Sequence, residues 1–426
     1  MVRSPVGNAA RSDLRPAAIA IGAFTATYIA LDFNKLYALR YGADLGTFLQ
    51  TAANLIHGSS WNFGEWRPHL EVHDSWILFV LAPFIALAPR AETMLVLQVI
   101  VVAAAAIPLV LLARDIGVSP RAANLLGIAY LLTPSAQGLA YDNFSENVFV
   151  PLLAFSTARA ARSRSLTWAL VGTQLLMAVK EDEILFVAWF ALACFFFWDR
   201  RLGIATFALS ALNFGSYFGI ERVIGTHPST PAYALAIEDV SGKFTLVTLL
   251  LAPFAFVPLA IGRWLLLALP LLAEVVFAQN VPYEASRIGS HYTAPLLACS
   301  AMAAAFGLRR APGFARAMIP CALIVMLFVF NDTVVRPGRW PYIVDWHAYA
   351  RAVAVRNTSV PVLLHRRDEG AWAVAAVNPR VRLERRPDPN FVACPAYNTN
   401  AAAFFSSIGI GRWQGWTLCG GVPLPP

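Results

Sequence analysis

The chain has 426 residues, of which 58% are hydrophobic and only 14% are charged. Soluble globular domains carry about 25% charged residues, so this composition excludes an ordinary soluble domain and predicts a polytopic membrane protein. The formal net charge is +8 at pH 7. It does not indicate nucleic-acid binding, because most basic residues lie in short gaps between apolar runs, where they set the orientation of membrane helices.

Apolar runs typical of membrane helices recur along the chain. The first follows a basic N-terminal segment without a small-residue cleavage signature, so we expect an uncleaved membrane helix and no signal peptide. The shortest runs fall below the roughly 20 residues that span a membrane; they are counted because the charge pattern between them requires them. The runs lie at 16–33, 92–112, 122–140, 146–160, 166–180, 184–198, 202–220, 244–262, 264–279, 292–308 and 314–331.

Arginine-rich gaps between these runs predict the membrane orientation. With the N-terminus in the cytoplasm, every arginine-rich short gap falls on the cytoplasmic side, as the positive-inside rule requires. Eleven crossings then place the C-terminus outside the cytoplasm. The arginines that determine this orientation are Arg3, Arg11, Arg15, Arg114, Arg121, Arg159, Arg162, Arg164, Arg200, Arg201, Arg263, Arg309, Arg310 and Arg316.

One further apolar run, Trp76–Ala88 (WILFVLAPFIALA), would reverse this parity if it crossed the membrane. It is short and contains Pro83, and a proline removes a backbone hydrogen bond from a helix. We therefore expect this run to lie flat on the outer interface or to be re-entrant. It would then belong to a first outer loop of residues 34–91; the alternative is a short helix that crosses.

Acidic residues and histidines gather in the loops that this orientation places outside. The charged run Lys180–Glu183 interrupts two apolar runs, and a charge at membrane mid-depth costs roughly 2.5–3.5 kcal/mol. We therefore expect it at the tip of an outer hairpin, and we predict one convergent polar site at the outer membrane face. The other loop residues that contribute to it are Asp44, His69, His73, Asp74, Asp142, Glu146, Glu238, Asp239, Glu284, Arg287 and His291.

Two positions in the first outer loop have alternative interpretations. Asp44 near the outer surface suits a base that takes a proton from a hydroxyl, but its spacing favours a helix cap before Leu45. His69 and His73 have the i, i+4 spacing of a divalent-metal pair on a helix. Pro68 and the loop context favour ordinary hydrogen-bonded histidines.

The crowded acids Glu181, Asp182 and Glu183 would raise one another's pKa unless a cation lies between them. Lys180, Arg287 or a metal ion would serve, and the two cations would equally suit a phosphate of a lipid-linked substrate. Alternatively, Lys180 pairs with a neighbouring acid. The sequence contains no Gly-rich phosphate loop, Cys-x-x-Cys pair or G-x-S-x-G elbow, so ATP-driven transport and cytosolic nucleotide-sugar chemistry are unsupported.

The segment 332–426 differs from the rest because it is polar and has no apolar run long enough to span a membrane. We expect a small extracytoplasmic domain of mixed α/β character. Residues 360–365 and 371–377 have the β-branched alternation typical of short strands. Cys394 and Cys419 would lie in an oxidising compartment, which favours a disulfide over free thiols.

Several short motifs occur in an order that resembles one known family. They are DLGTFLQ (Asp44–Gln50), VHDSW (Val72–Trp76), LVLQ with a following PLVLLAR (Leu95–Arg114), YDNFSE (Tyr141–Glu146), VKED (Val179–Asp182) and SRIGSHYTAPLL (Ser286–Leu297). Over residues 40–310 the chain resembles domain of unknown function 2079, a family of predicted bacterial and archaeal integral membrane proteins. That family looks like a distant branch of the GT-C fold, the multi-helix glycosyltransferases that use polyprenyl-phosphate sugars.

The chain departs from the family pattern in two motifs. The family commonly has His-Phe-Ser-Pro where this chain has His73–Trp76, and Phe-Asp-Phe-His-Pro-Glu where it has Tyr141–Glu146. Asp142 and Glu146 are kept, but Phe144 replaces the family's histidine.

The apolar runs and their charge pattern predict an all-α polytopic membrane protein, with about 11 transmembrane helices over residues 1–331 and the extracytoplasmic domain over 332–426. The resemblance implies that the transmembrane domain is GT-C-like. It implies Asp44 as the general base, and a donor phosphate held by Lys180 and Arg287. No cofactor is certain beyond a possible divalent metal, for which His69, His73, Asp142 and Glu146 are the candidate ligands. The implied substrate-binding residues are His73, Asp74, Asp142, Glu146, Lys180, Glu181, Asp182, Arg287, His291 and Tyr292.

These observations predict a glycosyltransferase that moves a sugar from a polyprenyl-phosphate donor to an acceptor at the extracytoplasmic face of the bacterial inner membrane. A non-catalytic transporter or lipid-handling protein is the alternative, because acids on a transport path would also explain charges among membrane helices. The sequence shows no inverted repeat with broken helices, and its charges fall at helix ends, which favours the enzyme. A scaffold whose arginine-rich tail binds a partner is a third alternative.

Overall fold

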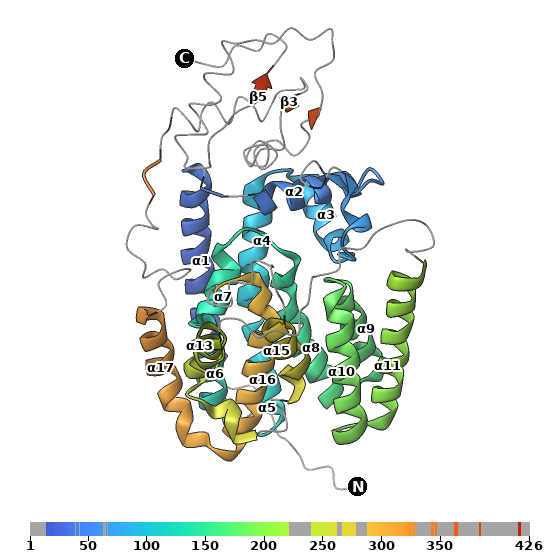
Figure 1. Cartoon of the computed structure of the whole chain (residues 1–426). Helices are drawn as coiled ribbons and strands as arrows, with labels where there is room; N and C mark the ends of the chain where they lie inside the picture. The colour runs from blue at the N-terminus through green and yellow to red at the C-terminus, as the bar shows by residue number, and fades with distance from the viewer. Residues whose placement is uncertain are drawn as a thin grey trace.

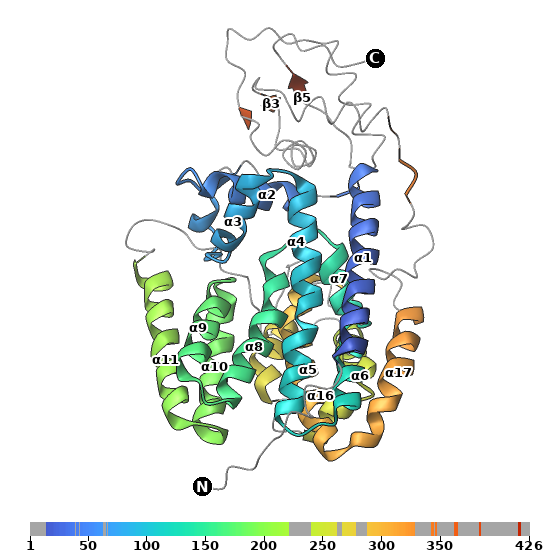
Figure 2. The same ribbon diagram turned by 180° about the vertical axis from the view of Figure 1, so that it is seen from behind.

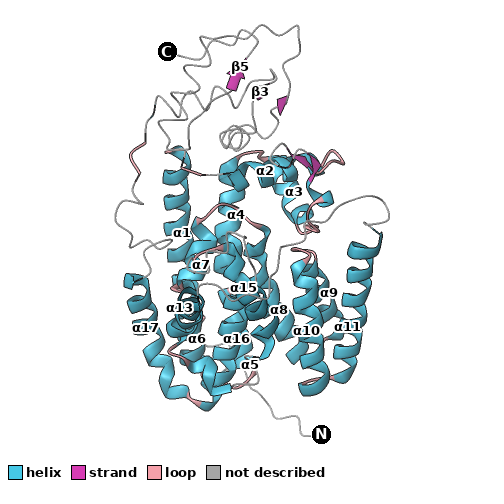
Figure 3. Ribbon diagram, viewed as in Figure 1, coloured by secondary structure: helices cyan, strands magenta, loops and turns pink. Residues whose placement is uncertain are grey.

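The computed structural model of the chain is predominantly helical, with only a few short strands (Figure 3). This confirms the predicted fold class at the level of a helical protein. The structure describes residues 14–38, 40–41, 43–62, 65, 67–220, 240–261, 266–277, 288–328, 342–344, 346, 362–364, 383–384 and 416–418.

Two long apolar helical segments lie side by side. Helix α1 (Arg15–Tyr37) packs against α4 (Ala91–Ala104), and α4 continues through Ala105 into α5 (Ala106–Asp115), as Figure 2 shows from behind. Within the described residues, α1 and the segment Ala91–Asp115 are the two helices long and apolar enough to cross a membrane as single helices. At 1.5 Å per residue, each exceeds the hydrocarbon thickness of about 30 Å.

All eleven apolar runs found in the sequence contain helix, but most helices are short or interrupted. Pro134 begins α7, where its ring suits a first turn, and the preceding helix α6 ends at Leu131. The helices after α5 are α6 (Pro120–Leu131), α7 (Pro134–Tyr141), α8 (Val150–Arg162), α9 (Leu166–Met177), α10 (Asp182–Phe197), α11 (Arg200–Gly215), α13 (Val240–Leu251), α15 (Leu269–Phe277), α16 (Ala294–Arg310) and α17 (Ala315–Phe328). Single turns of 3₁₀ helix extend several of them, at Glu146–Phe149, Ala252–Phe254, Val257–Ile261, Leu266–Ala268, His291–Thr293 and Pro312–Phe314, and a π turn at Ser216–Ile220 follows α11.

The core is centred on α16, which packs against α5, α6 and α8. This helix is rich in alanine, and Ala301, Ala304 and Ala305 are completely buried. Small side chains let helix backbones approach closely, which is how helices associate where no water drives them together. The buried Tyr130 on α6 fills space beside Phe155 on α8 and donates its hydroxyl to the carbonyl of Val102 at 3.1 Å.

The two ends of the helix bundle carry different residues. The turns that join α5 to α6, α10 to α11 and α16 to α17 lie at the lower end in Figure 1, and they carry arginines. Near this end, Arg159 of α8 pairs with Asp115 of α5 at 2.9 Å. Helices α2 (Ala43–Leu55) and α3 (Leu78–Leu87) lie at the upper end with the acidic loops. We call these the arginine end and the acidic end.

The first loop at the acidic end is compact and ordered by its own hydrogen bonds. After α2 comes a short antiparallel pair, β1 (Trp61–Asn62) and β2 (Arg67–Pro68), followed by one turn of 3₁₀ helix at His69–Glu71. Helix α3 packs on α2 and contains Pro83. With 10 residues, α3 rises about 15 Å, half of a hydrocarbon core, which favours the expected interfacial or re-entrant placement of Trp76–Ala88 over a crossing.

The C-terminal segment begins next to α1. The backbone N–H of Tyr342 donates to Asn34 Oδ1 at 2.7 Å, and Asn34 Nδ2 donates to the Tyr342 carbonyl at 3.0 Å. Further on, β3 (Val362–Leu364) lies parallel to β4 (Leu383–Glu384) and antiparallel to β5 (Trp416–Leu418) in a sheet of order β4-β3-β5.

The strand predicted at 360–365 is therefore confirmed over residues 362–364. The strand predicted at 371–377 and both cysteines of the predicted disulfide, Cys394 and Cys419, lie outside the described residues. The other cysteines, Cys194, Cys299 and Cys321, are free thiols in α10, α16 and α17.

Candidate functional site

Asp44 lies in the first turn of α2, which begins at Ala43. The predicted alternative of a cap before Leu45 is therefore wrong by position, because the helix already includes Asp44. Burial, and to a smaller extent the nearby charges of Asp142, Glu146 and Glu65, raise the pKa of the Asp44 carboxyl from 3.8 to about 6. A carboxyl that titrates near neutrality suits a general base.

Beside Asp44, a carboxylate orients a buried histidine. His69 is only 1% exposed, and its Nδ1 lies 2.9 Å from Glu65 Oε2 and 3.0 Å from Oε1. Glu65 is held in turn by Asn62, whose Nδ2 donates to Oε2 at 2.7 Å and whose Oδ1 accepts the Glu65 backbone N–H at 2.8 Å. Among the described residues, His69 Nε2 is buried without a hydrogen-bond partner. A histidine so oriented has one ring nitrogen available for a proton or a substrate atom.

The first loop is joined to the turn between α9 and α10 by a histidine–glutamate pair. His73 Nδ1 lies 2.9 Å from Glu181 Oε1, and the backbone N–H of Asp74 donates to Glu181 Oε2 at 3.1 Å. The backbone N–H of Ile77 adds a third link, to the Ala178 carbonyl at 2.7 Å. We call these three contacts the clasp. The clasp holds the charged run that opens α10 against the first loop, so the predicted outer hairpin is a tight turn between two helices.

Protonation of the clasp follows from these contacts. Burial lowers the pKa of His73, but the hydrogen bond and charge of Glu181 outweigh it and raise the pKa above 6.5. Burial raises the pKa of Glu181, but the His73 hydrogen bond and the charges of His73 and Lys180 leave it below 4.5. Asp74 differs: burial and the charge of Glu181 raise its pKa to about 6, against a hydrogen bond from Trp76 Nε1.

We expect the clasp to stabilise the protein most between pH 4.5 and 6.5. The His73 contribution is complete below pH 6.5 and is lost as the pH rises through its raised folded pKa. The Glu181 contribution is present above pH 4.5 and is lost as the pH falls through its lowered folded pKa. In thermal melts of detergent-purified protein, His73→Gln should lower Tm most inside this window. The exposed His57→Gln should shift Tm little at any pH; a His73→Gln effect that does not vary with pH contradicts the ion pair.

Glu146 and Asp142 both lie at the acidic end, where α7 ends. Glu146 is buried, and its Oε1 and Oε2 accept from Ser75 Oγ at 3.4 Å and Ser145 Oγ at 3.3 Å. Asp142 ends α7, and its carbonyl accepts from Gln98 Nε2 at 3.2 Å. Between them, Phe144 is completely buried and packs edge-on to Phe48 at 5.4 Å. At the position of the family's histidine, this chain therefore has an apolar contact.

Lys180 occupies the middle of the carboxylate cluster. Its Nζ lies 3.5 Å from Asp182 Oδ2 and 5.4 Å from the ring centroid of Tyr292, at the start of the α16 segment. Burial lowers the pKa of the lysine, but the charges of Asp182, Glu146 and Glu181 outweigh it, so the pKa is raised and Lys180 is a cation. The predicted alternative, a pairing of Lys180 with a neighbouring acid, is confirmed for Asp182.

Tyr292 lies close to both Lys180 and Asp44. The charges of Lys180 and Asp44 both act on its hydroxyl. The adjacent His291 ring lies 4.0 Å from the Tyr292 ring. The structure thus brings together Asp44, His69, His73, Asp74, Asp142, Glu146, Lys180, Glu181, Asp182, His291 and Tyr292, the described members of the predicted site. Arg287, Glu238, Asp239 and Glu284 lie outside the described residues.

The predicted metal centre receives no support from the geometry. His69 and His73 do face the same way, with ring centroids 5.4 Å apart. However, each presents its Nδ1 to a different glutamate: His69 to Glu65 of the same loop, and His73 to Glu181 of the turn between α9 and α10. Among the residues that the structure describes, no group of three or more His, Cys, Asp or Glu side chains could hold a metal ion.

Sequence reasoning missed a second polar cluster on α1. Asp32 is completely buried and accepts from Tyr41 Oη at 2.6 Å. Lys35 Nζ donates to the Tyr141 carbonyl at 2.7 Å and lies over the rings of Tyr41 and Tyr141. Since Tyr141 precedes Asp142, this cluster adjoins the site. The signal was present in the motif LDFNK, where an acid and a base interrupt an apolar helix.

The profile of one family, described as predicted membrane protein (DUF2079), matches residues 35–217 and 208–351 of this chain. The matched region contains every described residue of the candidate site and extends past the end of α17. No curated protein matches the chain. Since the two matches together span well over half of the sequence, the chain belongs to the DUF2079 family of predicted membrane proteins.

Proposed function

We propose that this protein is a GT-C-like glycosyltransferase that transfers a sugar from a polyprenyl-phosphate donor to an acceptor hydroxyl at the extracytoplasmic face of the membrane. The observation that carries the proposal is the Asp44 carboxyl, whose pKa is raised to about 6 by burial and by neighbouring carboxylates, in the same cluster as cationic Lys180. A base and a phosphate-binding cation in one partly buried site are what glycosyl transfer from a lipid phosphate requires.

In the proposed step, the acceptor oxygen attacks the anomeric carbon of the sugar while Asp44 takes the proton of the acceptor hydroxyl. The bond between the anomeric carbon and the phosphate oxygen breaks, and its electron pair leaves with the polyprenyl phosphate. Lys180 stabilises the charge that develops on this leaving phosphate. His69, oriented by Glu65, and Tyr292 hold the acceptor or the sugar by hydrogen bonds.

The orientation of the chain is part of the proposal. We propose eleven crossings with the N-terminus in the cytoplasm, a transmembrane domain over residues 1–331 and an extracytoplasmic domain over 332–426. The separation of the arginine end from the acidic end supports it. A reporter active only outside the cytoplasm should be active when fused after residue 426 and inactive when fused within the α10–α11 turn; the reverse pattern contradicts this orientation.

The direct test is binding of a polyprenyl-phosphate lipid to the purified protein. We expect saturable binding by the wild type and a loss of about tenfold or more in affinity for Lys180→Gln, because charged contacts to phosphate contribute about 1.5–3 kcal/mol. Lys180→Arg should retain binding, and Arg121→Gln, an exposed arginine in the first turn of α6 at the arginine end, is the control. Monodisperse elution of each variant shows that folding is intact.

A second candidate function, transport, is favoured by the buried Asp32. An ionisable side chain within an apolar helix is typical of an ion path, and Asp32 Oδ2 has no hydrogen-bond partner within the part of the chain that the structure describes. The binding experiment separates the two candidates. If the wild type shows no saturable lipid binding, the glycosyltransferase proposal is contradicted and proton-coupled transport through Asp32 becomes the better proposal. Proton uptake into vesicles that contain the wild type or Asp32→Asn then tests transport.

A further inference from the structure

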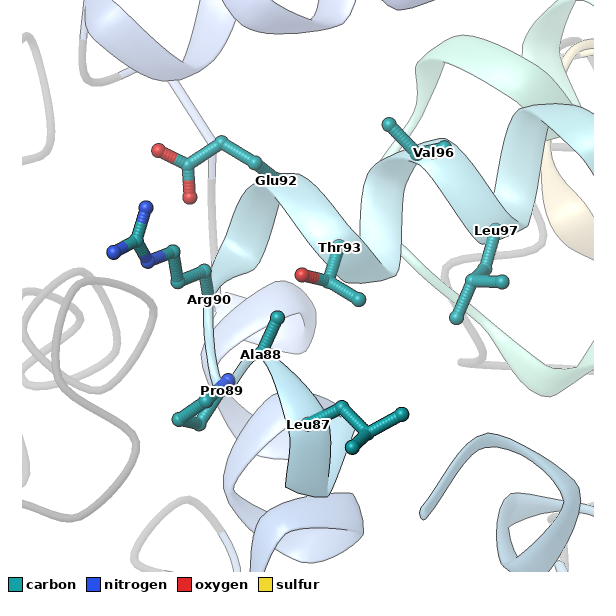
Figure 4. A pocket seen from close by; sticks show the side chains of 8 residues that line it. All are labelled: Leu87, Ala88, Pro89, Arg90, Glu92, Thr93, Val96 and Leu97. Atoms are coloured by element: carbon teal, nitrogen blue, oxygen red, sulfur yellow. The ribbon is translucent and has the colours of Figure 1, made fainter. Parts of the chain in front are cut away.

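A pocket away from the polar site opens where α3 joins α4. It has a volume of about 500 Å³ and is lined by Leu87, Ala88, Pro89, Arg90, Glu92, Thr93, Val96 and Leu97. Its walls divide by chemistry, as Figure 4 shows: the charged groups of Arg90 and Glu92 lie on one side, Leu87 and Leu97 lie on the other, and Thr93 lies between them. The volume falls in the range of about 300–1,000 Å³ typical of small-molecule sites.

The pocket continues an exposed apolar surface on α3. Val80, Phe84 and Leu87 are 47%, 48% and 87% exposed. At the start of this surface, the Trp76 ring stacks on Phe79, and its Nε1 donates to Asp74 Oδ1. Tryptophan with a polar N–H end and an apolar ring is enriched at membrane–water interfaces. Trp76 therefore marks α3 as an interfacial helix whose apolar face contacts lipid.

The charges at the pocket specify the headgroup. Arg90 is exposed, and its side chain makes no hydrogen bond or ion pair within the described part of the chain. Its guanidinium suits a phosphate, which it binds through paired N–H donors. Glu92, on the same side of the pocket, would repel a ligand that carries only negative charge, but it attracts an ammonium group.

We infer that this pocket is a binding site for a zwitterionic aminophospholipid such as phosphatidylethanolamine. Arg90 binds the phosphate, Glu92 binds the primary ammonium, and an acyl chain lies against Leu87 and Leu97 and onward over the α3 surface. Polyprenyl phosphate, which has no cationic group, does not fit this charge pair. The inference is independent of the proposed glycosyl transfer, because none of these residues belongs to the polar site.

The test is lipid retention by the full-length protein in nanodiscs of equal phosphatidylethanolamine, phosphatidylglycerol and phosphatidylcholine, measured by native mass spectrometry after detergent extraction. We expect phosphatidylethanolamine to be retained at least about fivefold over the other two. Arg90→Gln should lower the retention of phosphatidylethanolamine about tenfold, because charged contacts to a phosphate are worth about a tenfold change in affinity. Arg121→Gln, an exposed arginine in the first turn of α6 at the arginine end, should leave it unchanged.

A second variant tests the selection by charge. Glu92→Gln should shift retention from phosphatidylethanolamine towards phosphatidylglycerol, because the repulsion of an anionic headgroup is removed while the Arg90 contact stays. Equal retention of the three lipids by the wild type, or undiminished retention of phosphatidylethanolamine by Arg90→Gln, overturns the site. A melting temperature equal to that of the wild type shows that each variant is folded.

Discussion

Asp44→Asn should lower the rate of sugar transfer by about a hundredfold or more while the protein remains folded. General acid–base catalysis contributes about 10²–10⁴ in rate, and an amide of the same shape cannot take the acceptor's proton. The melting temperature should rise or stay the same, since burial disfavours the charged form of this carboxyl and the substitution removes the charge. The measurement is transfer of labelled sugar from a polyprenyl-phosphate donor by detergent-purified protein.

The pH profile separates a proton acceptor from a merely structural Asp44. The carboxyl acts as a base only when ionised, so the wild-type rate should fall as the pH drops through about 6. The residual rate of Asp44→Asn should not show this decrease at low pH. Asp115→Asn is the control, because Asp115 is an exposed carboxylate at the arginine end whose ion pair with Arg159 contributes little. Full activity of Asp44→Asn rejects the assigned role.

Gly138→Ala should destabilise the protein and distort the site together. Gly138 lies in α7, where an added Cβ would collide with the backbone oxygen and Cα of Gly289. Backbone atoms cannot rotate away as a side chain can, so we expect a loss of about 1–3 kcal/mol, the usual cost of overpacking, or more. This contact positions the turn before His291, which Ser135 Oγ also holds through the Ile288 carbonyl at 2.7 Å.

The consequences of Gly138→Ala are measured by thermal melting and by lipid binding in parallel. Displacement of the 288–290 turn should move His291 and Tyr292, so polyprenyl-phosphate binding should weaken even below the melting transition. Gly22→Ala in α1 is the control, because no atom lies within 4 Å of the added Cβ there. That variant should gain up to about 1 kcal/mol from better helix propensity. Equal melting temperatures for the two variants contradict the close approach of α7 to Gly289.

The helical segments can be predicted from the sequence because an apolar run in a membrane protein forms a helix without needing a particular tertiary partner. Every backbone polar group in lipid must bond within its own segment, so a long apolar run becomes a helix whatever surrounds it. This is why the runs at 16–33 and 92–112 correspond to α1 and to α4 with α5. Arginine positions similarly predicted which turns share an end of the bundle. Element boundaries followed from prolines such as Pro134, whose restricted backbone acts locally.

The candidate site was predicted as a set of residues but not as an arrangement. His69 and His73 have the spacing of a metal pair, and only the tertiary structure shows that Glu65 and Glu181 occupy their Nδ1 atoms. Glu181 is 108 positions from His73, and no local pattern specifies such a pairing. Asp32 was missed although the motif LDFNK contains the signal, and only the structure shows that Asp32 is buried and accepts from Tyr41, beyond the end of α1.

The sequence by itself determined the helical class, the helices that the apolar runs form, the segregation of arginines from acids and the family resemblance that the profile match confirmed. The tertiary structure alone decided which charges meet, which are buried and which lie near a cation. The pKa of Asp44 is raised to about 6 because the fold buries this carboxyl and packs α2 where Asp142 and Glu146 also lie. Hydrophobicity acts through composition, which can be read along the chain, whereas a pKa depends on distances between residues that folding brings together.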